Sequence, residues 1–266
     1  MLMNETAAFD AVAAEYDKKF SETLVGKEQR KISRQWLEKV LHASKLQILE
    51  INCGTGDDAL WLGSLGHDVI ATDQSMAMIN EAKDKLSLSG LQNVQFMPCD
   101  FKNLIGSFGN KKFDLIFSNF AGLNCVAPGE MIVLAEQLSS LLTKEGELAI
   151  VVFGKHSWWE TFFFLLKGQP GNAFRRWRNG NVSVKLADNV YQPVYYYSVK
   201  QLQAMLSPLK LVDKKPIGLF IPPSYLEAAM EKRRRLFKSL TSLEKRINGA
   251  AVTSSFADHV FLLFKK

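Results

Sequence analysis

Short apolar runs alternate with helix-like segments from residue 46 to residue 153. The apolar runs have the length of buried strands, and they cover 46–51, 68–73, 94–100, 113–119 and 146–153. Helix-like stretches lie between them near 57–65, 75–88 and 129–142. This alternation predicts an α/β fold whose mostly parallel sheet is covered by helices on both faces, with a ligand at the carboxyl ends of the strands.

The residues on either side of this core follow other patterns. Residues 1–45 predict a helical cap of two helices, because Phe9, Val12 and Tyr16 recur at helical spacing and a second such pattern follows. Residues 154–208 contain an aromatic helix and a loop rich in glycine, asparagine and arginine. An apolar strand near 209–220, a basic helical segment within 221–256 and the final strand "DHVFLLFKK" complete the chain.

Composition is that of an ordinary globular protein. The 266 residues are 47% hydrophobic and 23% charged, which suits one large α/β domain or two small ones. A formal net charge of +6 permits anionic partners, but much of the excess lies in two short runs. Nucleic acid is therefore not the expected partner, and the oligomeric state is left open.

Cysteine usage and the N-terminal pattern predict a cytoplasmic protein. Cys53, Cys99 and Cys125 are widely spaced and form no C-x-x-C pattern, so neither a disulfide framework nor a metal site is expected. The first residues lack a basic segment followed by an apolar one, and the apolar run "WWETFFFLLKG" is interrupted by Glu160. The chain is expected to be soluble, with contact at a membrane surface left open.

The segment "ILEINCGTGDD", residues 48–58, carries the first sign of chemistry. Gly54, Gly56 and Ala59 make a G-x-G-x-x-A turn between a strand and a helix, which alone is weak support for a nucleotide site. Asp73 ends the next strand, at the separation where an acid accepts hydrogen bonds from both hydroxyls of a ribose. Turn and acid together predict a nucleoside-containing ligand.

Charge favours S-adenosylmethionine over NAD at this turn. Glu50 closes the strand, and Asp57 and Asp58 occupy the first helical positions, where a dinucleotide would place its pyrophosphate. Each carboxylate would oppose that anion by on the order of 1–4 kcal/mol at close range. S-adenosylmethionine has no phosphate, and its ammonium suits an acid at the strand end. An NAD-dependent oxidoreductase remains the alternative.

Two further strand ends agree with a nucleoside-and-sulfonium ligand. Asp100 follows the third strand, at the edge where an adenine amino group would be recognised, with Cys99 and Phe101 beside it. Asn119 and Phe120 follow the fourth strand, so they lie over the middle of the sheet, next to a reactive sulfonium. The order of these positions along the chain predicts a single extended site.

The motifs "LEINCGTG", "DQSMAM", "PCDF" and "FDLIFSNF" resemble, in this order, those of the class I S-adenosylmethionine-dependent methyltransferases. "FDAVAAEYD" resembles the N-terminal helix of the subgroup that acts on quinones and other small molecules. The resemblance covers residues 8–155. It implies a Rossmann-like, seven-stranded sheet with an antiparallel last strand, and with helical insertions after strand five and between the last two strands.

The resemblance also implies the division of the chain and the cofactor site. One methyltransferase domain over 1–266 would comprise the cap 1–45, a cofactor-binding core 46–153, and substrate-side insertions 154–208 and 221–256. Tyr16 would close over S-adenosylmethionine, Asp73 would take the ribose and Asp100 the adenine. The candidate cofactor-binding residues are Tyr16, Glu50, Asn52, Cys53, Gly54, Thr55, Gly56, Asp73, Gln74, Cys99, Asp100, Phe101, Asn119 and Phe120.

Asn52 departs from the family pattern, which usually has glycine there. Asparagine adopts the left-handed conformation more easily than most residues, so the turn is still expected to form. Its amide can also bind the methionine carboxylate. A catalytically inactive, methyltransferase-like binding protein is a second alternative that would explain this departure.

Methyl transfer chiefly requires a nucleophile aligned within roughly 3–3.5 Å of the methyl carbon, and a base is optional. His156, three residues past the fifth strand, is the candidate base or substrate contact. The insertions are expected to form the pocket for a small acceptor that is apolar or aromatic. A lipophilic acceptor would fit such a pocket, which would also have room for an anionic group. The candidate pocket residues are Trp158, Trp159, Phe162, Phe163, Tyr195, Tyr196, Tyr197, Arg175, Arg176 and Arg178.

The basic helix near 231–246 most simply presents a solvated face. Because its basic residues are interleaved with Leu236 and Phe237, it is also a candidate for contact with an anionic membrane.

Overall fold

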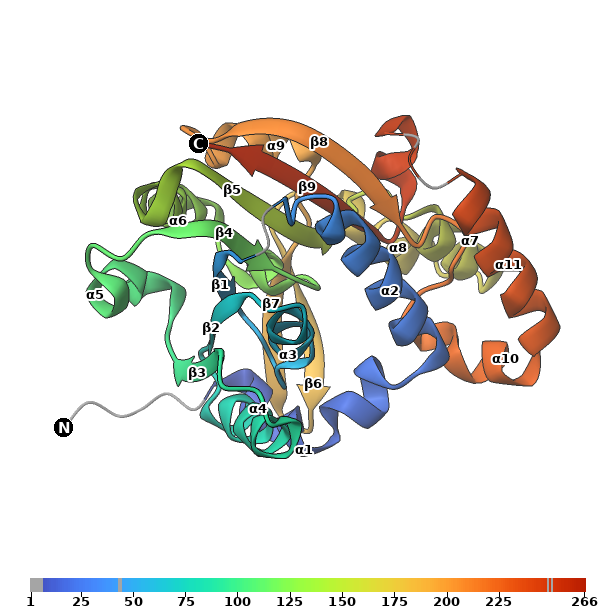
Figure 1. The fold of residues 1–266 in the computed structure, drawn as a ribbon. Helices are drawn as coiled ribbons and strands as arrows, with labels where there is room; N and C mark the ends of the chain where they lie inside the picture. Colours follow the sequence, from blue (N-terminus) through green and yellow to red (C-terminus); the bar gives the residue numbers. More distant parts are fainter. Residues whose placement is uncertain (1–6, 43–44, 248, 250) are drawn as a thin grey trace.

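A seven-stranded sheet forms the centre of the protein in the computed structural model, which describes residues 7–42, 45–247, 249 and 251–266 (Figure 1). Its strands lie in the order β3-β2-β1-β4-β5-β9-β8. They are β1 (Gln47–Ile51), β2 (Asp68–Asp73), β3 (Val94–Pro98), β4 (Phe113–Ser118), β5 (Leu142–Phe153), β8 (Lys210–Ile217) and β9 (His259–Lys265). Strands β1 to β5 pair in parallel, whereas β9 is antiparallel to both β5 and β8. The predicted Rossmann-like sheet with an antiparallel last strand is confirmed.

Side chains alternate between the two faces of this sheet, so each face has its own core. Along β5, Ala149 and Val151 pack on one face while Leu148 and Ile150 pack on the other. The first face is covered by α2 (Leu24–Glu38), α3 (Asp57–Ser64) and α4 (Met76–Ser89), and the second by α5 (Leu104–Phe108), α6 (Pro128–Leu141) and α9 (Val199–Met205). Helices on both faces were predicted, and the core clusters confirm them.

The insertion after β5 contains a hairpin as well as the expected helices. Helices α7 (Trp158–Leu166) and α8 (Pro170–Ala173) are followed by β6 (Asn181–Ala187) and β7 (Val190–Tyr195), which form a separate two-stranded sheet. Asn189 takes a left-handed φ of 60° in the turn between them. The expectation of a helical insertion is wrong for 181–195, where exposure alternates along β6 in the manner of a strand.

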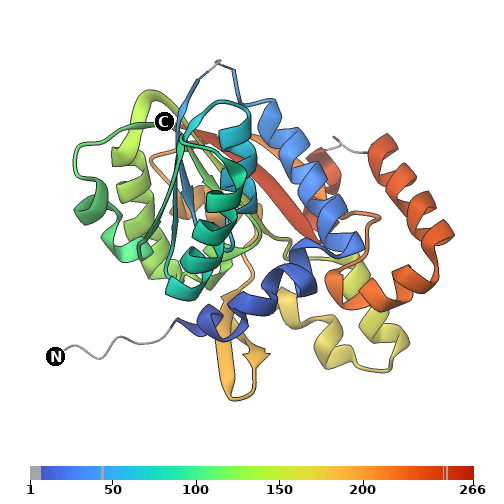
Figure 2. The same ribbon diagram turned by 60° about the horizontal axis from the view of Figure 1, so that its bottom comes forward.

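Short helical turns precede α2 at the N-terminus. The turns η1 (Ala8–Val12), α1 (Ala13–Tyr16) and the π-helical η2 (Asp17–Ser21) replace the first expected helix. The η1 turn contacts β6, β7 and α4, so the hairpin and the N-terminal segment lie side by side (Figure 2). This arrangement places both beside the carboxyl ends of β1 and β2.

The last insertion is attached to the rest of the protein by two carboxylates. It contains η6 (Ser224–Leu226), α10 (Glu227–Lys232), α11 (Arg234–Ile247) and η7 (Ala251–Phe256). Glu227 accepts hydrogen bonds from the amides of Leu24 and Val25, at the start of α2. The buried Glu244 accepts hydrogen bonds from four consecutive backbone amides over 218–221. Within the described ranges no helix is long and apolar enough to cross a membrane.

We predict that Glu244→Ala lowers the free energy of unfolding by about 3 kcal/mol, because it leaves four amides at a buried position without their acceptor. Glu231→Ala, at an exposed position in α10, is the matched control and should change stability by less than about 0.5 kcal/mol. Urea denaturation of both variants measures the difference. Equal stabilities would show that the Glu244 hydrogen bonds do not hold α11 in place.

Candidate cofactor and acceptor site

One cavity of about 860 Å³ lies at the carboxyl ends of the parallel strands. Its volume is near the upper end of the range of about 300–1,000 Å³ that is usual for small-ligand pockets. Of the fourteen predicted cofactor-binding residues, all except Gly56 line it. The structure therefore brings into one cavity residues that are more than 100 positions apart in the sequence.

The turn between β1 and α3 depends on left-handed backbone conformations. Asn52, Gly54 and Gly56 have φ values of 56°, 53° and 83°. A Cβ on Gly56 would lie 2.6 Å from the ring of Phe96, so this glycine allows the turn to approach β3. A Cβ on Gly54 would meet only Tyr16, at 3.9 Å. Gly54 therefore presents bare backbone to the cavity, and Tyr16 faces it from the N-terminal segment.

The side chain of Asn52 is engaged with the end of β4. Its Oδ1 accepts a hydrogen bond from Ser118 Oγ at 2.6 Å, and its Nδ2 donates to the carbonyl oxygen of Asn119 at 2.8 Å. Asn52 thus takes the left-handed conformation expected of it, and its amide links the glycine turn to β4.

Asp73 and Asp100 are oriented by backbone amides. Asp73 accepts from Gly54 N through Oδ2 and from Ser75 N through Oδ1, both at 2.9 Å. Burial raises the pKa of Asp73, and these hydrogen bonds oppose the rise. Asp100 accepts from Lys102 N through Oδ1 at 3.0 Å. Carboxylate oxygens have further lone pairs, so both side chains can also accept from ligand hydroxyl or amino groups.

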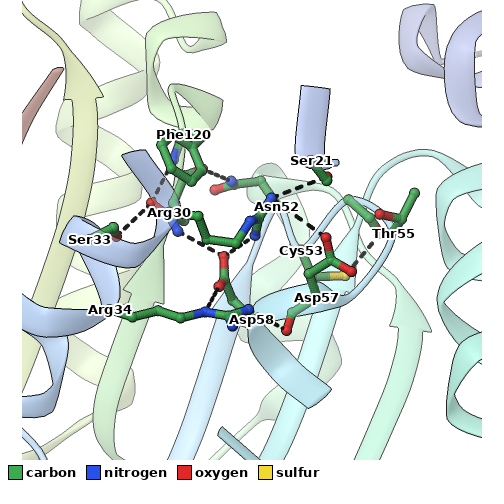
Figure 3. Close-up of polar contacts among 12 residues, drawn as sticks. Ser21, Arg30, Ser33, Arg34, Asn52, Cys53, Thr55, Asp57, Asp58 and Phe120 are labelled. Carbon is green, nitrogen blue, oxygen red and sulfur yellow. Dashed lines mark hydrogen bonds and ion pairs between the residues drawn. The ribbon is translucent and has the colours of Figure 1, made fainter. Parts of the chain in front are cut away.

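The buried Asp58 and Asn119 and the partly buried Arg30 and Arg34, together called the Asp58 cluster, lie beside the cavity. Figure 3 shows the two arginines on either side of Asp58. Asp58 pairs with Arg30, pairs with Arg34 Nε at 2.7 Å and accepts from Asn119 Nδ2 at 2.7 Å. Burial alone would raise the pKa of Asp58, but the two arginines hold it below its ordinary value. The guanidinium of Arg30 also lies 5.2 Å from the centre of the Phe120 ring.

A second set of ion pairs joins the glycine turn to the N-terminal segment. Lys85 of α4 pairs with Asp17 at 2.5 Å and with Asp57 at 2.7 Å. Thr55 Oγ1 donates to Asp17 Oδ1 at 2.6 Å. These contacts hold η2 against the turn, next to Tyr16.

These pairings correct the electrostatic interpretation of the turn. Asp57 and Asp58 are matched by Lys85, Arg30 and Arg34, so they do not present free negative charge to a ligand. Arg30 was not identified from the sequence, although it and Arg34 lie one helical turn apart on α2. Two of the three carboxylates that spoke against a pyrophosphate are therefore neutralised.

Glu50 is the acid that stays without such a partner. It lines the cavity, its side chain is buried, and its Oε2 has no hydrogen-bond partner within the described residues. Burial, reinforced by the charge of Asp58, raises the pKa of Glu50 well above its ordinary value. A buried carboxyl without a partner is suited to a cationic group of a ligand.

The opposite end of the cavity lies where β4, β5 and β9 meet. Phe120, Phe153, Tyr196, Tyr225 and His259 line it. His259 is buried and stacks on Phe153 with ring centres 4.8 Å apart, and Phe120 meets its ring edge-on at 5.4 Å. His259 Nδ1 lies 3.3 Å from Asp258 Oδ2. An aromatic enclosure with one histidine results.

His156 does not line the cavity, contrary to the prediction. It lies in the loop after β5, and its ring packs edge-on against Trp177 at 4.7 Å. His259 occupies the position that was expected for His156, because the antiparallel β9 begins beside Phe153, at the same sheet edge where β5 ends. An antiparallel final strand thus brings its first residue, not its last, to the cavity.

Most of the predicted acceptor aromatics are also elsewhere. Tyr196 lines the cavity, but its neighbours Tyr195 and Tyr197 pack in the core on the α6 side, where Tyr197 Oη donates to Val126 O. The α7 residues Trp158, Trp159, Phe162 and Phe163 do not line the cavity either; Trp158 donates to Leu219 O, and Phe163 packs against Tyr225. Helical spacing indicated an aromatic cluster, but it did not indicate which way that cluster faces.

The two arginines of η5 (Arg175–Trp177) line the cavity and are already paired. Arg175 forms a bidentate pair with the buried Glu160, through Nε at 2.7 Å and Nη2 at 3.1 Å. Arg176 binds Glu160 and Asp258, and its guanidinium lies over the rings of Phe153 and Tyr196. Arg178 does not line the cavity. Glu160 and Asp258 balance both cations, so the predicted anionic subsite is not evident.

Known methyltransferases resemble this chain in sequence and in fold. Residues 48–146 match a family model described as "Methyltransferase domain". A tRNA 5-carboxymethoxyuridine methyltransferase from Escherichia coli (strain K12) is 30% identical over 152 residues, 56% of this chain and 57% of that protein. The chain spans about half the length of the curated relatives it matches.

Solved structures resemble the whole chain. The CcbJ methyltransferase from Streptomyces caelestis has a TM-score of 0.62 at 17% identity, over 98% of both chains. The DhpI–SAM–HEP complex has a TM-score of 0.60 at 17% identity, over 97% of this chain and 94% of that one. The fold is the α/β Rossmann-like methyltransferase fold, as predicted, and its cofactor-side core, residues 48–146, is the part that matches the methyltransferase domain model.

We predict that Asp58→Asn destabilises the protein by about 3–5 kcal/mol, because it removes the buried anion that the partly buried Arg30 and Arg34 share. Asp57→Asn is the matched control at a more exposed position, where the Asp57 side chain is 27% exposed against 2% for Asp58. Its effect should stay below about 1 kcal/mol. Denaturant unfolding of both variants measures this; a loss in Asp58→Asn no larger than in the control would show that the Asp58 cluster is not a stabilising centre.

We predict that Glu50→Gln stabilises the ligand-free protein as pH rises above the ordinary glutamate pKa of 4.5. Folding raises the pKa of Glu50 above its unfolded value. Relative to the variant, the wild type is therefore most stable at pH values below the unfolded pKa, and it loses stability as the pH rises toward the folded pKa. Unfolding at about pH 5 and about pH 8 should show a falling difference between wild type and variant. An equal pH dependence in both proteins would contradict a raised Glu50 pKa.

Proposed function

We propose that this protein transfers a methyl group from S-adenosylmethionine to a small aromatic or apolar acceptor. The observation that carries the proposal is that one cavity joins two chemically different ends. Asp73, Asp100 and the glycine turn lie at one end, and the aromatic enclosure around His259 lies at the other. Phe120, between them, contacts His259.

The residues at the first end fit the cofactor. The unpartnered carboxyl of Glu50 suits its ammonium, and the bare backbone at Gly54 leaves room for its methionine portion. Asp73 keeps free lone pairs for the ribose hydroxyls, and Asp100 for the adenine amino group. S-adenosylmethionine supplies an electrophilic methyl group on a sulfonium. The DhpI complex named above contains SAM on the same fold.

The residues at the second end hold and orient the acceptor. Phe153 and Tyr196 provide flat apolar walls for an aromatic or apolar ring. His259 Nε2 takes the proton of an acceptor hydroxyl or amino group, while Asp258 lies beside Nδ1. The N-terminal segment and the β6–β7 hairpin complete the wall and exclude water.

A nucleoside in tRNA is the second candidate acceptor. It is supported by the Escherichia coli relative, whose name gives that substrate, and it agrees with the formal charge of +6. The buried positions of Tyr196 and His259 favour a small free acceptor, because a tRNA nucleoside would first have to be turned out into the cavity. Transfer of labelled methyl groups to tRNA, compared with a set of phenols and quinols, distinguishes the two acceptors.

We predict that titration calorimetry detects S-adenosylmethionine binding and no NAD binding. Asp73→Asn should weaken the binding at least tenfold, because it replaces one of the two acceptor oxygens with an NH2 donor, which can accept neither from a ribose hydroxyl nor from the backbone amides at Gly54 and Ser75. Asn52→Gly is the control, because the amide of Asn52 is engaged with Ser118 and Asn119. The affinity of this variant for S-adenosylmethionine should stay within about threefold of wild type. NAD binding without S-adenosylmethionine binding would favour an oxidoreductase, and binding without any methyl transfer would favour an inactive relative.

We predict that His259→Asn lowers kcat by about 100-fold or more for an acceptor that must lose a proton. His156→Asn, at the position outside the cavity, should keep activity within about threefold. The pH profile separates a base from a packing residue, because loss of a base removes the acidic limb of kcat against pH. Equal effects of both substitutions would reject His259 as the proton acceptor.

A further inference from the structure

Helix α11 presents two exposed flanks of different chemistry on either side of its buried stripe. Phe237, Thr241 and Glu244 are buried and face the protein. At 3.6 residues per turn, one flank beside this stripe is basic and the other is apolar. The basic flank is Arg234, Arg235, Lys238, Lys245 and Arg246, and the apolar flank is Leu236, Leu240, Leu243 and Ile247.

The cations of the basic flank have no anionic partner among the residues that the structure describes. All five are exposed, and none forms an ion pair with another part of the chain that the structure describes. The nearby acids are used elsewhere: Glu227 binds the start of α2, and Glu244 binds the amides over 218–221. Among the described residues of α10 and α11, Glu231 is the one exposed acid. The flank therefore carries net positive charge that an external anion can match.

The apolar flank forms a continuous stripe that is open to solvent. Its members are spaced at i, i+4, i+7 and i+11, so they follow one side of the helix. Leu236, Leu243 and Ile247 are 44%, 40% and 40% exposed, and Leu240 is partly buried against the core. Three large apolar side chains in one row are unusual on a surface that contacts only water.

The pairing of the two flanks selects the kind of partner. A nucleic acid would neutralise the basic flank but leave the apolar flank in water. An anionic bilayer matches both, because its headgroups attract the cations while its acyl boundary takes up the leucine and isoleucine side chains. Helix α11 also lies at the outer edge of the molecule in both views (Figures 1 and 2).

We propose that α11 is a docking surface for an anionic lipid membrane, with its apolar flank at the headgroup–acyl boundary and its basic flank against lipid phosphates. This surface does not depend on the proposed activity. It continues directly from the cavity wall, because Pro223, Ser224 and Tyr225 line the cavity just before α10 begins. If the proposed methyl transfer holds as well, a lipophilic acceptor would reach the cavity from the membrane along this segment.

Vesicle sedimentation of the ligand-free, full-length protein tests the surface. Vesicles of phosphatidylcholine mixed with phosphatidylserine should bind the protein at least tenfold more tightly than phosphatidylcholine alone. Arg235→Gln/Lys238→Gln should weaken binding about 25-fold, since each cation near the surface contributes a factor of about five. Leu236→Ser/Leu243→Ser should weaken it at least tenfold by removing apolar contact.

Matched variants on other faces control for net charge and surface hydrophobicity. Lys83→Gln/Lys200→Gln removes two exposed cations from α4 and α9, and Leu88→Ser/Ile132→Ser removes two exposed apolar side chains from α4 and α6. Both should bind as the wild type does. All substituted side chains are exposed, so every variant is expected to fold, and thermal unfolding checks this.

Two results would overturn the proposal. One is a lack of vesicle binding through α11, seen either as no sedimentation with phosphatidylserine vesicles at low salt or as equal losses in the α11 variants and their controls. The other is vesicle binding that is insensitive to Leu236→Ser/Leu243→Ser, together with binding of bulk tRNA that Arg235→Gln/Lys238→Gln abolishes. That second pattern would assign the basic flank to nucleic acid instead.

Discussion

The buried carboxylate of Asp58 is the interaction on which the ligand end of the protein depends. It stands at the start of α3, directly after the glycine turn, and joins that turn to α2 through Arg30 and Arg34 and to the end of β4 through Asn119. A buried carboxylate is costly unless it is paired and hydrogen-bonded, and this one is both. The cap helix, the glycine turn and the β4 end therefore hold each other in place, and Phe120 is fixed between the two ends of the cavity.

The N-terminal segment is attached to the same turn by a second set of charges. Lys85 and Thr55 hold Asp17, while Asp10 accepts hydrogen bonds from Ser75 and Ala77 at the start of α4. Tyr16 lies between these two attachments and faces Gly54. These anchors are ion pairs and hydrogen bonds to a helix start, and Val12 and Ala13 add a buried apolar contact with Met78 of α4. Polar contacts at the glycine turn and at the start of α4, together with this apolar contact, thus attach the N-terminal segment over the turn.

Much of the fold could be predicted from the sequence, because strands buried on both faces leave continuous apolar runs such as 46–51 and 113–119. The cofactor-side residues could also be predicted, since each follows a parallel strand and all such ends meet at one sheet edge. The ion-pair partners that these residues receive from other helices could not be predicted. Arg30 meets Asp58 across 28 positions, and nothing local to α2 shows which face of that helix the arginine occupies. The β6–β7 hairpin was not predicted, because the glycine-rich residues before it indicated a loop.

The acceptor side was harder to predict because it depends on direction as well as position. His156 follows β5 and was expected at the ligand, but the chain turns away there, and the antiparallel β9 brings His259 to the same edge. Tyr195, Tyr196 and Tyr197 share a segment, yet only the middle ring lines the cavity, because side chains of extended backbone alternate. The acids at the glycine turn were recognised correctly as charges, but their cations came from α2 and α4.

A structure determined with S-adenosylhomocysteine bound is the most direct test of the central claim, that one cavity holds a nucleoside at Asp73 and an acceptor at His259. We predict ribose hydroxyls within hydrogen-bond distance of Asp73, the adenine beside Asp100, the amino group at Glu50, and the sulfur beside Phe120, facing an open space that His259 lines. A ligand bound elsewhere, or one whose sulfur is separated from His259 by the Asp58 cluster, would contradict it.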